Sequence, residues 1–263
     1  MIQTAVIFVT ERCIIYHSDL VKIDTWNCTN LLALFITRDY ISISYLNIMP
    51  TISITTKGVK TDYKITKGNI EKVFKQATQS EITEGLNWYK DANKFAQSVS
   101  NETKKEISIE HVAGVTSALS IRNKWDRNKI DAKNLILAYY RLKKVSDISV
   151  CTFTSNKHKA VNILESNSNQ IETILSGLKT QNFKRNILGC KESVTIDGHA
   201  FCISAGIVNA LKKVPSISAK NYKIISEEYR QATKMINKKY NLNLIPSQLQ
   251  AVTWVTYKRL HNK

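Results

Sequence analysis

The stretch 175–187, which reads L-S-G-L-K-T-Q-N-F-K-R-N-I, decides the fold class of this chain. It lies within a longer pattern over residues 171–187, in which apolar positions recur at intervals of three and four, as is typical of helices. Ser176 and Gly177 interrupt that pattern, and glycine permits the backbone conformations of a tight turn. We therefore expect two short helices joined by this turn.

The same helical periodicity begins at about Lys67 and continues on both sides of the turn. Ser80 and Ser108 precede helical stretches and are typical N-cap residues. Glycine and proline number only 8 and 3, which favours helices. The other expected helices cover residues 67–77, 89–99, 109–119, 131–142, 156–164, 200–211, 222–240 and 247–260. The pattern therefore predicts a mainly α-helical domain over residues 66–263.

The N-terminal segment, residues 1–65, differs in composition from the rest of the chain. Its first 48 residues are dense in Ile, Thr, Tyr and Cys and favour short strands. Met49 stands where the composition changes, and two interpretations stay open. Either Met49 is the natural start and the preceding residues are translated upstream sequence or a loosely attached, poorly ordered addition, or the segment is a genuine small β-rich appendage.

The charge balance indicates an anionic partner. Lys and Arg outnumber Asp and Glu by 38 to 21, which gives a formal charge of +17. Such a field attracts a polyanion, and nucleic acid is the first partner to consider. The alternative is that an AT-rich genome, which encodes Lys, Asn and Ile freely, accounts for the excess.

Cysteine spacing and hydropathy argue against a metal-binding protein and a membrane-spanning protein. The five cysteines, odd in number and without metal-ligand spacing, are Cys13, Cys28, Cys151, Cys190 and Cys202. We interpret them as reduced thiols of a cytoplasmic protein and assign no metal. The most apolar run, residues 31–49, is broken by Arg38 and Asp39, so we expect no membrane span.

A second short stretch, V-T-I-D-G-H-A at residues 194–200, follows the helical pair. Helix, glycine turn, helix and this step together resemble the helix-hairpin-helix DNA glycosylase superfamily, whose hairpin L-P-G-[VIL]-G-x-x-[TS]-A is followed by V-D-[TR]-H. The matching residues are Leu175, Gly177 and Leu178 in the hairpin and Asp197, Gly198 and His199 in the step. Phe183 takes the place of the small residue that ends the family's hairpin motif.

Two further segments stand where this family has comparable ones. Residues 118–128, A-L-S-I-R-N-K-W-D-R-N, resemble the helix end and loop that carry the residues inserted into DNA. Residues 155–163, S-N-K-H-K-A-V-N-I, resemble the N-x-K-A-x-x-I helix that precedes the hairpin. The last helix, residues 247–260, is also similar to phage proteins with the same helical domain. The resemblance therefore implies a helical glycosylase-like domain of a phage type.

The hairpin has a physical reason to bind DNA, because backbone N–H groups at a glycine turn and a helix N-terminus bind phosphate. The DNA-binding residues that the resemblance implies are Gly177, Lys179, Thr180, Lys184, Arg185 and His199. Lys179 replaces the second glycine of the family hairpin. This change weakens the amide cradle and places a cation beside the phosphate.

The resemblance implies that Asp197 is catalytic. Cleavage of an N-glycosidic bond passes through an oxocarbenium-like transition state, which one carboxylate near the sugar can stabilise. The base must be flipped out of the duplex, with Arg122 and Asn123 as candidates to fill the gap and Trp125 as a stacking or pocket-wall residue. Gln181 stands where family members with strand-cleaving activity carry a lysine, which implies a monofunctional enzyme unless Lys179 or Lys184 supplies the amine.

Other readings of these residues stay open. Asp197, followed by glycine, has the chemistry of an N-cap for the expected helix 200–211, and capping and catalysis can coexist. The alternative functions are a non-catalytic DNA-binding module, a phage enzyme that modifies DNA bases, and an interaction protein whose charge is only compositional. We expect a monomer that acts on double-stranded DNA without a cofactor, in the cytoplasm or in that of a host.

Overall fold

The computed structural model describes residues 50–142 and 144–261, together with four strands in the first 50 residues. The chain divides into two compact units, Met1–Pro50 and Thr51–Lys263. The strands of the first unit are β1 (Ala5–Thr10), β2 (Cys13–Ile14), β3 (Leu32–Thr37) and β4 (Tyr40–Tyr45). They pair antiparallel in the order β2-β1-β3-β4. Met49 and the Arg38-Asp39 pair lie outside the described residues.

The second unit is mainly helical, as the periodicity predicted. Its helices are α1 (Lys67–Phe74), α2 (Gln79–Glu102), α3 (Ile109–Leu119), α4 (Trp125–Tyr140), α5 (Thr154–Leu164), α6 (Ile171–Leu175), α7 (Leu178–Ile187), α8 (Gly198–Ala205), α9 (Ala219–Tyr240) and α10 (Pro246–Leu260). Short 3-10 turns cover Val145–Asp147, Ser168–Gln170 and Leu211–Lys213. The predicted division into α6 and α7 at the turn 176–177 is confirmed, and Ser108 caps α3 as predicted.

Three predicted helix ends were wrong for local reasons. The N-cap of α2 is Thr78, because its hydroxyl accepts a hydrogen bond from Glu81 N while the Glu81 carboxylate accepts one from Thr78 N. This capping box starts α2 at Gln79, two residues before the start that Ser80 as N-cap predicted, and the helix continues without a break through the expected residues 89–99. Helix α4 likewise begins at Trp125, before the expected residue 131. Helix α8 ends at Ala205, because Gly206 adopts a left-handed conformation (φ 66°).

A β-hairpin opens the second unit. Strands β5 (Thr51–Thr56) and β6 (Val59–Lys64) pair antiparallel around Lys57 and Gly58, both of which have positive φ. Alternate residues Ile52 and Ile54 are buried in the helical core. The unit therefore starts at residue 51, whereas composition suggested a division after residue 65.

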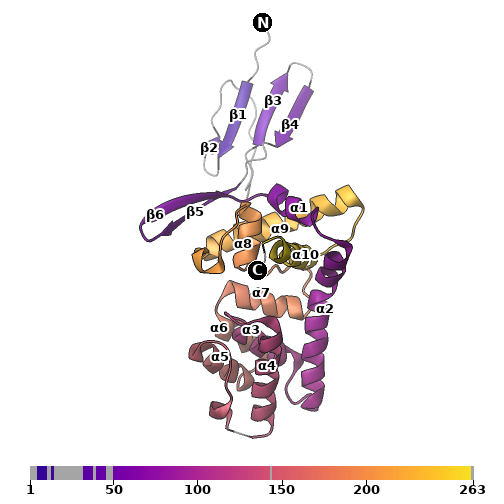
Figure 1. Ribbon diagram of the computed structural model, residues 1–263. Helices are drawn as coiled ribbons and strands as arrows, with labels where there is room; N and C mark the ends of the chain where they lie inside the picture. Colours follow the sequence, from indigo (N-terminus) through magenta and orange to yellow (C-terminus); the bar gives the residue numbers. More distant parts are fainter. Residues whose placement is uncertain are drawn as a thin grey trace. The chain divides into compact units, whose positions relative to one another are not determined.

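The helical unit has two hydrophobic cores. The first is built by the hairpin with α1, α8, α9 and α10, and the second by α3 to α7. Helix α2 passes from one core to the other, since Ile82 and Leu86 pack on the first while Ala92 and Ala96 lie in the second (Figure 1). Helix α7 also belongs to both, and the segment 194–197 leads from it into α8. The two cores are therefore joined through α2 and α7.

Candidate functional site

Asp197 lies at the N-terminus of α8, where it is partly exposed. Its Oδ1 accepts a hydrogen bond from Ala200 N at 2.8 Å, so the N-cap interpretation is correct, although the helix begins at residue 198. Its Oδ2 accepts a second bond, at 3.1 Å, from Trp254 Nε1 of α10. The two bonds fix the orientation of the carboxylate at the N-terminus of the helix.

Lys258 brings an amine to the same place. It lies one turn after Trp254 on α10, and its Nζ is 3.5 Å from the Trp254 ring centroid. Burial lowers the pKa of Lys258, against the opposing negative charges of Glu84 and Asp197. One indole therefore touches an amine through its face and a carboxylate through its N–H group.

Aromatic rings connect this carboxylate to the start of α4. The ring centroid of Trp88 on α2 is 6.0 Å from that of Trp254 and 5.0 Å from that of Trp125. Phe183 of α7 lies 5.9 Å from Trp88 and 6.2 Å from Trp125. All three tryptophans are partly exposed. Trp125, which the resemblance implied as a stacking or pocket-wall residue, therefore belongs to an aromatic cluster that reaches the neighbourhood of Asp197.

Tyr222 holds the backbone that precedes Asp197, and Tyr89 joins α2 to α10. The Tyr222 hydroxyl donates to Val194 O at 2.8 Å and accepts from Ile196 N at 3.0 Å. The Tyr89 hydroxyl donates to Gln250 Oε1 at 2.9 Å, and burial raises the pKa of Tyr89 to about 12. Burial also raises the pKa of Tyr222. Both phenols are therefore neutral donors near pH 7, and Tyr222 keeps the segment before Asp197 in place.

The hairpin turn uses its own polar groups internally. Ser176 takes the left-handed conformation (φ 56°), whereas Gly177 has a negative φ of −100°. Gly177 N donates to Leu175 O at 2.6 Å, and the buried Thr180 hydroxyl donates to Gly177 O at 2.9 Å. Gly177 and Thr180 thus shape the turn, and the N-cap Gly177 offers no side chain to accept from the first N–H groups of α7.

Glu172 of α6 pairs with two of the expected DNA-binding cations. Its carboxylate accepts hydrogen bonds from both Arg185 Nε, at 2.8 Å, and Arg185 Nη2, and its Oε1 lies 3.5 Å from Lys184 Nζ. The Arg185 guanidinium lowers the pKa of Glu172, so the carboxylate is charged at neutral pH. Lys184 is buried. In this structure the pair faces Glu172, and Lys184 is not exposed to a phosphate.

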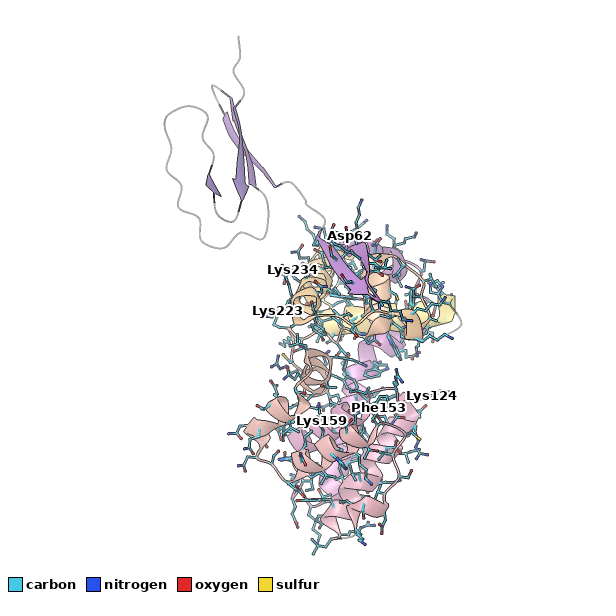
Figure 2. The ribbon with its side chains drawn as sticks, turned by 90° about the vertical axis from the view of Figure 1, so that its left-hand side faces the viewer. Asp62, Lys124, Phe153, Lys159, Lys223 and Lys234 are labelled. Atoms are coloured by element: carbon cyan, nitrogen blue, oxygen red, sulfur yellow. The ribbon has the colours of Figure 1, made fainter. Side chains whose placement is uncertain are left out.

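Two other lysines lie at the turn. Lys179 of α7 is partly exposed. Lys159 of α5 donates from Nζ to Ser176 Oγ at 2.9 Å, and Figure 2 labels it on the face shown there. Sequence reasoning missed Lys159, because its approach to the turn depends on how α5 packs against α6.

The remaining expected site residues are distributed as follows. Arg122 has φ 54°, and its guanidinium carbon lies 5.2 Å from the Phe153 ring centroid. Asn123 Nδ2 donates to the buried carboxylate of Asp131 at 2.9 Å, so this side chain supports its loop. His199 is buried, with its ring centroid 5.7 Å from that of Tyr257, in a supporting position behind the carboxylate.

A protein-family model matches residues 52–262, which span the hairpin, all ten helices and the site described above. Its description is a family of unknown function, DUF7178. The chain belongs to this family. No curated protein and no solved structure matches the chain.

The DUF7178 match starts within β5, close to the boundary between the two compact units. The matched range contains Asp197, Trp254, Lys258 and the helical hairpin of α6 and α7. Across the described residues of this unit, no helix is long and apolar enough to cross a membrane. The family therefore coincides with the helical unit that contains the site.

Proposed function

We propose that the helical unit binds duplex DNA and excises a base, with Asp197 as the carboxylate that stabilises the sugar cation. The observation that carries the proposal is the partly exposed carboxylate, fixed between the N-terminus of α8 and Trp254 Nε1, at the end of an aromatic cluster. The resemblance of the hairpin and of the V-T-I-D-G-H-A step to DNA glycosylases supports the same chemistry.

The chemistry requires a charged carboxylate in a fixed orientation. In the transition state the N-glycosidic bond lengthens and positive charge develops on the sugar, so a nearby anion lowers the barrier. The two hydrogen bonds of Asp197 fix its orientation, and each of its oxygens keeps a further lone pair after accepting one of them. The partly exposed indoles of Trp88 and Trp125 offer faces on which a flipped base can stack.

The binding part of the proposal rests on charge. The chain carries a formal charge of +17, and Lys159 and Lys179 stand at the turn where the first N–H groups of α7 have no side-chain cap. Neutralised phosphates release counterions, so affinity should fall steeply as salt rises. Lys184 and Arg185 have a smaller part in this binding than the sequence suggested, because both are paired with Glu172.

A second candidate, a DNA-binding module without catalysis, has one observation in its favour. Both oxygens of Asp197 already have structural partners, so its carboxylate has a stabilising role without any chemistry. The two candidates differ in one respect: only the enzyme produces abasic sites in DNA.

The experiment compares wild type with Asp197→Asn, using an aldehyde-reactive probe that labels abasic sites in genomic DNA. Asparagine is also a good N-cap, so the variant keeps the Ala200 bond. The matched control is Asp126→Asn, since the Asp126 side chain is 89% exposed and lies at the start of α4. We expect labelling with wild type and the control and about 100-fold less with Asp197→Asn. Equal labelling by both Asp197 forms contradicts catalysis by this residue.

A further inference from the structure

Phe153 is an exposed aromatic residue that neither hydrophobic core uses. It is 49% exposed at the N-cap of α5. The Arg122 guanidinium lies over its ring, at 5.2 Å from the centroid. Figure 2 labels Phe153 between Lys124 and Lys159 on the face that it shows. An apolar ring among cations is the composition of a surface that receives both bases and phosphates of a nucleic acid.

A buried carboxylate joins the two loops that carry this pair. Asp131 is fully buried, and its Oδ2 accepts hydrogen bonds from Asn123 Nδ2 at 2.9 Å and from Cys151 N at 2.7 Å. Its Oδ1 accepts one from Arg127 Nε at 2.7 Å. The loop before α4 and the loop before α5 are therefore fixed to each other through one side chain.

A second contact strengthens the connection. Thr152 Oγ1 donates to Ile121 O at 2.7 Å, directly beside the two residues that form the stack. Arg122 has a left-handed backbone (φ 54°), which costs free energy in a non-glycine residue and persists only where the surroundings impose it. The stack of Arg122 on Phe153 is therefore built before any ligand arrives.

The charges and the exposed ring around Arg122 and Phe153 determine which kind of ligand fits this surface. Lys124 is exposed in the same loop as Arg122, and the acidic Asp126 that follows is paired with Lys129 at 3.0 Å. A guanidinium and an aryl ring both stack on nucleobases, and the neighbouring ammonium groups attract the phosphates that accompany a base. An acidic peptide would use the cations and leave the exposed ring without a partner.

We infer that Arg122 and Phe153 form a preassembled stacking site for an unpaired or displaced base of DNA. The inference rests on the proposed DNA binding and assigns a residue to it that the sequence did not suggest. It also changes one expectation, because the Asn123 side chain supports its loop through Asp131. The stacking residue of this loop pair is Phe153.

The test uses duplex DNA with 2-aminopurine opposite an abasic position, in low salt. Stacking on a protein ring quenches the fluorescence of this base and raises affinity. The variants are Phe153→Ala and Phe153→Trp, and the matched control is Ile130→Ala, since Ile130 is an apolar residue of α4 with 52% exposure. Base–aromatic stacking predicts a loss of affinity of about 10-fold for Phe153→Ala, with loss of the quenching.

The outcomes separate the inference from the proposed function. Wild-type behaviour of Phe153→Trp and Ile130→Ala, with the loss confined to Phe153→Ala, supports the stacking site. Salt-dependent binding that is equal in wild type and Phe153→Ala overturns the stacking site and leaves DNA binding in place. Failure of the wild type to bind any duplex at low salt overturns both.

Discussion

Replacement of Gly85 by alanine tests the packing that brings the site together. Gly85 lies in α2, where it faces α10 so closely that an added Cβ would be 2.5 Å from the N, Cα and Cγ2 atoms of Val252. Two of these atoms belong to the backbone, so relief requires the helices to separate by nearly 1 Å to reach ordinary contact. The same crossing carries the Tyr89–Gln250 hydrogen bond and the Trp88–Trp254 contact.

The size of the effect follows from two opposing terms. Overpacking against the backbone lowers the free energy of unfolding by about 3 kcal/mol, and the higher helix propensity of alanine raises it by about 1 kcal/mol. The net loss of about 2 kcal/mol corresponds to a fall in Tm of about 4 to 8 °C for a unit of this size. Separation of α2 from α10 should also lower any base excision or DNA binding that depends on Trp254.

The assay is thermal unfolding followed by circular dichroism, with Gly68→Ala as the matched control. Gly68 is also helical, but its added Cβ would meet only Thr66 Oγ1, at 3.8 Å. The control should be as stable as wild type or slightly more stable, because the propensity term acts alone. A Gly85→Ala protein with the Tm of Gly68→Ala would refute the account of this crossing.

Three further predictions follow from named contacts. Asp131→Ala removes the acceptor shared by Asn123, Cys151 and Arg127 and should cost about 3 kcal/mol in urea unfolding, whereas Asp126→Ala should cost less than about 0.5 kcal/mol. Trp254→Phe keeps the ring but removes the donor to Asp197 Oδ2; it should cost about 1 to 2 kcal/mol of unfolding free energy and slow base excision. Burial raises the pKa of Glu228, so this residue's contribution to folding stability is favourable below the ordinary pKa of 4.5 and is lost as pH rises. Glu228→Gln should therefore be as stable as wild type at pH 4 and more stable than wild type at pH 7. The reverse order of stabilities would contradict a raised pKa.

Local chemistry made part of the fold predictable from the sequence. The turn at Ser176 and Gly177 and the cap at Ser108 depend on residues within a few positions of each other, and both were predicted correctly. The start of α2 was predicted too late, because Ser80 was interpreted as the N-cap, whereas Thr78 and Glu81 form the capping box. A search for S/T-x-x-E would have found that start.

The site was less predictable, because its contacts join distant segments. Asp197 was identified, but its partner Trp254 lies 57 residues later on another helix. Burial of Lys184 depends on Glu172 of α6, which packs against α7 only after the turn has formed. Phe153 carried no motif, and its importance comes from exposure and from the Arg122 contact.

The most direct test of the central proposal is mass spectrometry of free bases released from genomic DNA by the full-length protein. The account predicts one base in the filtrate with wild type, and at least about 100-fold less of it with Asp197→Asn at equal protein and equal DNA binding. Release of the same base by both proteins, or by neither while both bind DNA in a salt-dependent way, would contradict catalysis by Asp197. The carboxylate would then act as the cap of α8 alone.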